Sequence, residues 1–160
     1  MKLYMKQQAF SLRNRFTIRD EKDRDVLTVE GELFTWGAKL HVYDLNGREI
    51  AFIRQQVPSF RPRYYIEING REIGCVVRRF ALIGTRFDID GLDWAAEGEF
   101  GSHDFIVTDN DKTIMTVRKA WFTWGDSYEL DIAARDVSLA AICVMLAIDM
   151  AVADSQNGNP

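Results

Sequence analysis

The residues best suited to chemistry are seven arginines that lie between positions 54 and 86, with no lysine among them. Only Glu67 and Glu72 oppose them, so this stretch has a formal charge of +5 in a chain whose net charge is −4. Guanidinium groups pair bidentately with phosphate, and Tyr64 and Tyr65 lie beside them, which makes the stretch a candidate anionic-ligand site. The alternative is a solvated outer face whose arginines pair with carboxylates. The candidate residues are Arg54, Arg61, Arg63, Arg71, Arg78, Arg79 and Arg86.

Catalytic groups are harder to assemble. His41 lies in the strand-like segment 40–45, and His103 lies in the turn-forming run 101–104. Ser102 and His103 are adjacent, and adjacent residues rarely converge as nucleophile and base, so turn formation is the preferred interpretation. No metal-ligand spacing occurs. We therefore expect a non-enzymatic protein with no catalytic residues, no cofactor and no bound metal.

Two acidic stretches were considered as calcium ligands. One holds Asp88, Asp90 and Asp93, and the other holds Asp109 and Asp111. Neither continues into a twelve-residue loop closed by a bidentate glutamate, so neither is an EF-hand. Turns between strands explain both stretches, with weak calcium binding as the alternative.

Asp149 lies inside the longest apolar segment, residues 137–153. This segment is apolar on every face, so a helix formed by it must be buried in protein or in lipid. Its length of about 25 Å is short of a hydrocarbon core of about 30 Å, and Asp149 at the centre of a bilayer would cost about 3 kcal/mol. We therefore predict a helix buried in protein and no transmembrane segment. A buried Asp149 needs a partner, most simply an arginine.

The elements that must position these residues are short strands. Apolar residues alternate with polar ones between Tyr4 and Ile132, and turn residues divide this region into about twelve strands. Asn46-Gly47 and Asn69-Gly70 predict hairpins, and residues 109–111 predict a third. A closed barrel of about twelve strands is wide enough to enclose the helix. We predict one mainly β domain, residues 1–153, with a central helix at 137–153 and a polar tail at 154–160.

The chain also repeats itself. Residues 46–50 and 69–73 share the sequence Asn-Gly-Arg-Glu-Ile, and residues 34–37 and 122–125 share Phe-Thr-Trp-Gly. Reuse of good turn sequences and an internally repeated meander explain this about equally well. Neither repeat resembles a binding site.

Composition indicates where the protein acts. The acidic net charge does not favour nucleic-acid binding, and residues 1–10 lack the continuous apolar stretch of a secretory signal. Cys75 and Cys143 lie in apolar runs, which predicts buried free thiols, with a disulfide as the alternative. Reduced thiols fit a reducing compartment. We expect a cytoplasmic protein.

A family resemblance rests mainly on residues 119–128, Lys-Ala-Trp-Phe-Thr-Trp-Gly-Asp-Ser-Tyr, followed by a strand, Asp136 and an apolar helix that reaches Asp149. The segment 98–106, which leads to residues 109–111, and the opening segments 4–6 and 16–20 extend it over nearly the whole chain. In these features the chain resembles the LURP-one-related family of the tubby-like fold.

The resemblance implies mainly the fold, a closed antiparallel tubby-like barrel around a buried hydrophobic C-terminal helix. Tubby proteins bind phosphoinositides, and phospholipid scramblases are thought to share the barrel. The basic lipid-binding residues of tubby do not align with this chain, and the scramblase pattern of a calcium loop before the helix and charges after it is absent. We expect a binding module for anionic phospholipid headgroups or another phosphate-bearing ligand, attached peripherally to membranes. The alternative is a protein-interaction or regulatory module with no lipid role.

Overall fold

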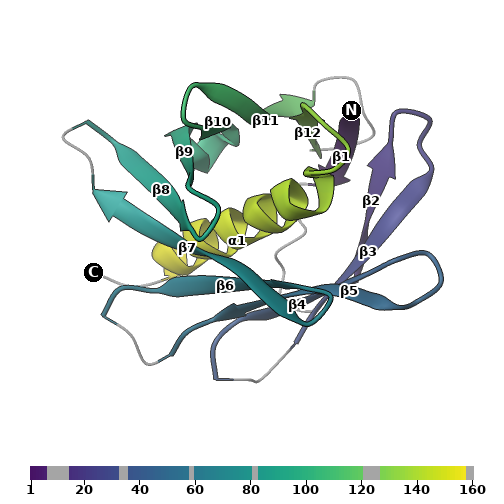
Figure 1. The fold of residues 1–160 in the computed structure, drawn as a ribbon, viewed down its shortest axis with the longest axis horizontal. Helices are drawn as coiled ribbons and strands as arrows, with labels where there is room; N and C mark the ends of the chain where they lie inside the picture. The colour runs from purple at the N-terminus through teal and green to yellow at the C-terminus, as the bar shows by residue number, and fades with distance from the viewer. Residues whose placement is uncertain (7–14, 33–35, 58–59, 81–82, 121–126, 158–160) are drawn as a thin grey trace.

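The computed structural model describes residues 1–6, 15–32, 36–57, 60–80, 83–120 and 127–157 (Figure 1). Twelve antiparallel strands close into a barrel, and one helix runs through it. The elements, in chain order, are β1 Lys2–Lys6, β2 Phe16–Asp20, β3 Asp25–Gly31, β4 Lys39–Tyr43, β5 Glu49–Gln55, β6 Arg63–Ile68, β7 Arg71–Phe80, β8 Thr85–Asp90, β9 Trp94–Glu99, the 3-10 turn η1 Phe100–Ser102, β10 Asp104–Asp109, β11 Lys112–Ala120, β12 Ser127–Ile132 and α1 Ser138–Asn157.

The barrel is a meander in which each strand pairs with the next one along the chain. Strand β1 closes it by pairing with β12 on one side and with β2 on the other. The terminal ammonium group of Met1 adds a 2.7 Å hydrogen bond to the carbonyl oxygen of Ile132. Full closure satisfies the backbone groups that an open sheet leaves at its edges. The predicted closed antiparallel barrel of about twelve strands is confirmed.

All three predicted hairpins form. Asn69 and Gly70 connect β6 to β7 with φ values of 49° and 75°, the left-handed region that Asn and Gly tolerate best. Gly47 (φ 78°) and Asn110 (φ 50°) occupy the turns that follow β4 and β10. The repeated pentapeptide at residues 46–50 and 69–73 leads into a strand both times, but the two turns differ in length: residues 44–48 separate β4 from β5, whereas only Asn69 and Gly70 separate β6 from β7. The other repeat, at 34–37 and 122–125, lies mostly outside the described residues.

The meander gives the barrel two unlike ends. Tight turns such as those at residues 44–48, 69–70 and 110–111 gather at one end, which we name the turn end. The chain enters α1 from this end, directly after β12. The connections β3–β4, β5–β6 and β7–β8, together with η1, gather at the other end, which we name the loop end. The C-terminal turn of α1 emerges there, beside the ends of β6, β7 and β8 (Figure 1).

Helix α1 forms the centre of the core. Val144, Met145 and Leu146 are completely buried, as inward-facing residues of the strands pack around the helix. The predicted buried helix is confirmed, but it begins at Ser138 and continues to Asn157, so the predicted boundary at Ala153 is too early. Residues 154–157 of the predicted polar tail therefore belong to the last helical turn. The segment Ser138–Gln156 is long and apolar enough to cross a membrane, a property that buried core helices share, and most of it is buried in the barrel.

Candidate functional site

The seven candidate arginines do not share one face. Arg54 lies on the outer wall, since its neighbour Ile53 points into the core and successive strand residues point to opposite sides. Its guanidinium is 3.7 Å from Glu67 and 3.6 Å from Glu72, and it stacks 4.5 Å above the ring of Tyr65. Here the alternative interpretation, an ion-paired outer face, is the better description.

Arg79 and Arg86 belong to the same outer wall. They lie opposite each other on β7 and β8, and both bind Asp88, at 3.2 Å and 2.7 Å. Arg79 also approaches Asp90 at 3.9 Å, and Arg86 lies 3.0 Å from Glu97. Asp88 and Asp90, two of the five carboxylates that are candidate calcium ligands, are therefore engaged by arginines. Such exposed ion pairs contribute little stability each and leave the arginines partly neutralised.

Two further arginines are separated from the rest by their position along the barrel. Arg71 begins β7 at the turn end, is exposed, and has no ion pair with another described residue. Arg63 begins β6 at the loop end but points outward with Val77, its partner on β7. Burial raises the pKa of the Cys75 thiol, and Arg63 lies close enough to oppose that rise. Neither residue lines the pocket that Arg61 and Arg78 share.

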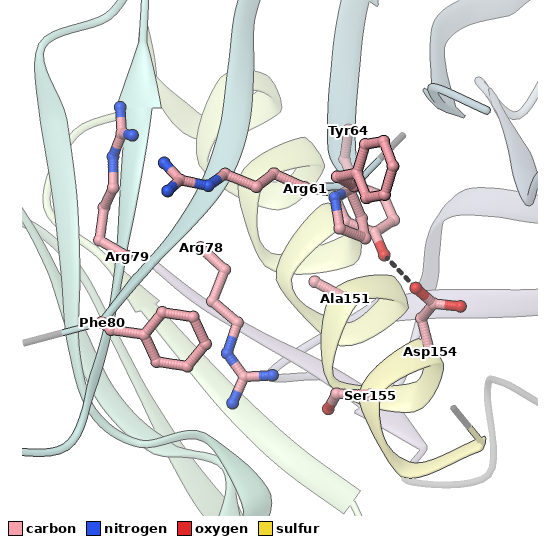
Figure 2. A pocket seen from close by; sticks show the side chains of 10 residues that line it. Arg61, Tyr64, Arg78, Arg79, Phe80, Ala151, Asp154 and Ser155 are labelled. Carbon is pink, nitrogen blue, oxygen red and sulfur yellow. Dashed lines mark hydrogen bonds between the residues drawn. The ribbon is translucent and has the colours of Figure 1, made fainter. Parts of the chain in front are cut away.

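The remaining pair, Arg61 and Arg78, lines a pocket of about 380 Å³ at the loop end (Figure 2). Aromatic walls come from Phe60 and Phe80, and the floor is the last part of α1 at Ala151. Arg79 contributes to the rim, but its guanidinium turns away toward Asp88. The pocket thus combines apolar walls with cationic groups, as ligand sites commonly do.

Arg78 differs from its neighbour Arg79 because it points inward. Its partner on β8 is Phe87, a core residue that is 1% exposed. The Nε atom is buried and has no hydrogen-bond partner. The guanidinium also makes a long 3.4 Å hydrogen bond from Nη2 to Thr85 Oγ1, and its Cζ atom lies 5.7 Å from the centre of the Phe80 ring. No carboxylate of the described residues lies within ion-pair distance. Arg78 is therefore a partly desolvated cation that has no counter-ion among the described residues.

A tyrosine and a carboxylate form the opposite wall of the pocket. The Tyr64 hydroxyl donates to Asp154 Oδ2 at 3.2 Å, and Gln55 Nε2 donates to the same oxygen at 3.1 Å. Burial, and then the charge of Asp154, raise the pKa of Tyr64, so its hydroxyl stays protonated. Sequence analysis placed Tyr64 beside the arginines but missed Asp154, because that residue was assigned to the tail.

A second buried cluster surrounds Asp149, which is 4% exposed. His103 Nε2 lies 2.9 Å from Asp149 Oδ1, and the Tyr128 hydroxyl donates to Oδ2 at 3.2 Å. The His103 ring stacks on Tyr128 with centroids 4.1 Å apart. The prediction of an arginine partner is wrong: a histidine 46 positions away takes that place. Burial raises the pKa of Asp149, and His103 and Tyr128 oppose this shift.

The arrangement of Ser102 and His103 is the predicted turn. His103 has φ 54° and its N–H bonds back to Phe100, while Ser102 Oγ donates to the carbonyl oxygen of Glu99 at 3.2 Å. The serine is thus not directed at the imidazole. Among the described residues, no group of three or more His, Cys, Asp or Glu side chains is arranged to hold a metal ion.

His41 lies on the outer wall between two carboxylates. Its Nε2 is 2.6 Å from Glu32 Oε1 and its Nδ1 is 2.8 Å from Glu49 Oε2, with the ring centroid 4.8 Å from that of Phe52. Burial lowers the pKa of His41, but the hydrogen bonds and charges of Glu32 and Glu49 together raise it above its ordinary value. The contact of His41 with Glu32 and Glu49 is therefore pH-sensitive, and none of these three residues lines the pocket.

Both cysteines are free and buried, as predicted. Burial raises the pKa of Cys143 to about 12. Burial also raises the pKa of Cys75, although Arg63 opposes the shift. Slow reaction of both thiols with reagents stays a prediction.

Comparison with known proteins gives consistent results. The family model described as LURP-one-related matches residues 1–149. The chain is 32% identical over 157 residues to a Bacillus subtilis (strain 168) protein named uncharacterized protein YxjI, covering 98% of this chain and 97% of that one. An X-ray structure of an Arabidopsis thaliana protein superimposes with a TM-score of 0.64 at 14% identity, covering 94% of this chain and 91% of that chain. The last likeness concerns the fold alone.

Proposed function

This chain belongs to the LURP-one-related family, and from this premise we propose that it is a non-enzymatic binding module for a phosphate-bearing ligand. The ligand site of the proposal is the pocket at the loop end, between Arg61, Arg78 and Tyr64. The ligand class is an anionic phospholipid headgroup or another phosphate-bearing molecule. The corresponding location is the cytoplasm, with peripheral attachment to membranes.

One observation carries the proposal: the cation of Arg78 is partly desolvated, and no carboxylate in the described part of the chain pairs with it. Burying a charged group is unfavourable unless it is paired and hydrogen-bonded. Its Nε donor is unused, and a guanidinium presents a planar fork of donors that matches two phosphate oxygens. A phosphate in the pocket would complete the hydrogen bonding of Arg78, which no described carboxylate does.

The surroundings favour an amphiphilic anion over a small inorganic one. Phe60, Phe80 and Ala151 offer apolar surface beside the guanidinium groups. Tyr64 and Asp154 are hydrogen-bonded to each other on the opposite wall. A ligand with a phosphate and an adjoining hydrocarbon portion would satisfy both kinds of surface.

Binding is proposed in preference to catalysis because the candidate catalytic groups are occupied elsewhere. Ser102 is bonded to a backbone carbonyl, and His103 is stacked on Tyr128 with Asp149 at its Nε2. His41 is held by two glutamates on the outer wall. None of these three residues lines the pocket.

The test uses dihexanoyl phosphatidate below its micelle concentration, titrated into the protein by isothermal calorimetry. Arg78→Gln should weaken binding about tenfold or more, since hydrogen bonds to charged groups contribute about 1.5–3 kcal/mol each. Arg71→Gln, at the turn end, is the matched control and should bind as wild type. Equal affinity for both variants, or a wild type that binds no phosphatidate, would refute the proposal and favour the protein-interaction alternative.

A further inference from the structure

Large apolar side chains stand exposed around the loop end. Trp36 is 86% exposed, Phe60 109%, Phe80 87% and Ile83 95%. Single exposed apolar residues are ordinary on protein surfaces. Here, however, four such side chains lie at one end of the barrel, three in the connections β3–β4, β5–β6 and β7–β8 and one, Phe80, at the end of β7. The turn end has only Leu45 comparably exposed among the described residues.

These side chains form a connected rim rather than a scatter. The β3–β4 connection that holds Trp36 touches the β5–β6 connection, because a side chain at Gly37 would meet Val57 at 3.0 Å. Phe60, in the β5–β6 connection, and Phe80, at the end of β7, line the same pocket. The rim therefore runs from β3–β4 across β5–β6 to β7–β8, around the opening that contains Arg78.

Charge is distributed unequally between the two ends. Arg61 and Arg78 lie between the exposed side chains of the rim, whereas Arg79 and Arg86 on the adjoining wall are paired with carboxylates. At the turn end, residues 20–25 carry four carboxylates and two cations, and residues 91–93 and 109–112 add a further excess of carboxylates. An anionic surface would attract the rim and repel the opposite end, which fixes one orientation.

We propose that the loop-end rim docks on an anionic lipid bilayer, with Phe60, Phe80 and Ile83 inserted among the headgroups. This docking rests on the proposed function for the ligand of the pocket, and it names a membrane lipid as the source of the phosphate. Phe and Trp side chains beside basic residues are what interfacial membrane binding requires. Side chains that project singly from separate connections suit a fluid interface better than a flat protein partner.

The rim provides two separable sources of affinity. Apolar insertion depends on Phe60, Phe80 and Ile83 and is insensitive to salt. Electrostatic attraction depends on the arginines, each of which strengthens binding to an anionic surface about fivefold and is screened by salt. Vesicle binding should therefore weaken with salt without disappearing, and it should fall when either component is removed.

The experiment is co-sedimentation with vesicles of phosphatidylcholine alone or with 20% phosphatidylserine, at low and high salt, about 25 and 300 mM. The triple variant Phe60→Ser, Phe80→Ser, Ile83→Ser should lose at least about tenfold in affinity for the anionic vesicles. The control Leu45→Ser, an exposed apolar residue at the turn end, should sediment as wild type. Each variant is first shown to melt within a few degrees of wild type, as expected for exposed positions.

Soluble dihexanoyl phosphatidate separates this inference from the proposed function. The single variant Ile83→Ser changes a rim residue that does not line the pocket, so it should bind the soluble ligand as wild type while losing part of its vesicle binding. A wild type that binds the soluble phosphatidate but no anionic vesicle even at low salt overturns the docking inference alone. A triple variant that binds vesicles as well as Leu45→Ser also overturns it. Rim-dependent vesicle binding without binding of the soluble ligand supports docking and counts against the pocket as its ligand site.

Discussion

Arg78 is expected to reduce stability in exchange for ligand binding, and Arg78→Met should therefore stabilise the fold. The buried Nε without a partner carries a desolvation penalty of about 1–3 kcal/mol. Methionine keeps the unbranched chain against the same apolar neighbours and removes the unpaired donor and the charge. Replacing buried charged groups by apolar ones of similar shape is often neutral or stabilising.

Two contacts of Arg78 offset part of this gain. Its position over Phe80, at 5.7 Å, contributes about 0.5–1 kcal/mol, and that ring is itself exposed. The hydrogen bond to Thr85, at 3.4 Å, is longer than the usual range of about 2.7–3.2 Å and contributes less than an ordinary one. The difference is a stabilisation of about 1 kcal/mol, which for a chain of this size raises Tm by about 2–4 °C.

The assay is equilibrium unfolding in urea, followed by tryptophan fluorescence and by circular dichroism. Arg78→Met should raise the midpoint with an unchanged slope, since the surface exposed on unfolding stays nearly the same. Arg71→Met is the control, because it removes an exposed arginine of the same strand and should change stability by less than about 0.5 kcal/mol. A destabilisation of about 1 kcal/mol or more by Arg78→Met would show that the guanidinium of Arg78 is already stabilised by its neighbours in the folded protein. The proposal that it needs a phosphate to complete its hydrogen bonding would then fail.

Other predictions concern residues away from the pocket. Leu146→Ala should cost about 2–5 kcal/mol and Leu146→Asp should prevent folding, because Leu146 is completely buried; a soluble Leu146→Asp protein that unfolds cooperatively would contradict the buried helix. Cys143 should react with a thiol reagent only after unfolding, since burial raises its pKa to about 12; labelling of native protein at the rate seen in denaturant would exclude this. The pKa of His41 is raised by Glu32 and Glu49, so its contribution is fully present below the unfolded pKa of about 6.5 and is lost as pH rises through the folded pKa. The stability difference between wild type and His41→Gln should therefore shrink with rising pH, and a difference that is constant between pH 5 and 9 would refute the ion-pair interpretation.

Features that depend on neighbouring residues could be read from the sequence. Asn69-Gly70 forms its hairpin because both residues accept positive φ, whatever surrounds them. The segment around Leu146 is apolar on every side, so it must be buried, and an enclosing barrel follows from that. The position of the helix end was missed, since Asp154 looks like part of a polar tail until its contacts with Tyr64 and Gln55 are known.

The sorting of the arginines was decided by the tertiary structure. Arg78 and Arg79 are adjacent and chemically identical, yet one lines the pocket and the other pairs with Asp88 on the outer wall. Cys75, Val76 and Val77 before them are all apolar, so the sequence shows no alternation from which to assign the inward side, and all three are buried in the structure. A shift of one residue would exchange the two arginines, and strand pairing across the barrel fixes that choice.

Long-range partners were likewise beyond the sequence. The segment containing Asp149 predicts burial and the need for a partner, but not that His103 and Tyr128 supply it. These residues come from η1, β12 and α1, and they meet only because the barrel closes around the helix with a particular register. Local residue types determined which elements form, whereas closure and register determined which side chains meet, because contacts between distant segments depend on the whole set of strand pairings.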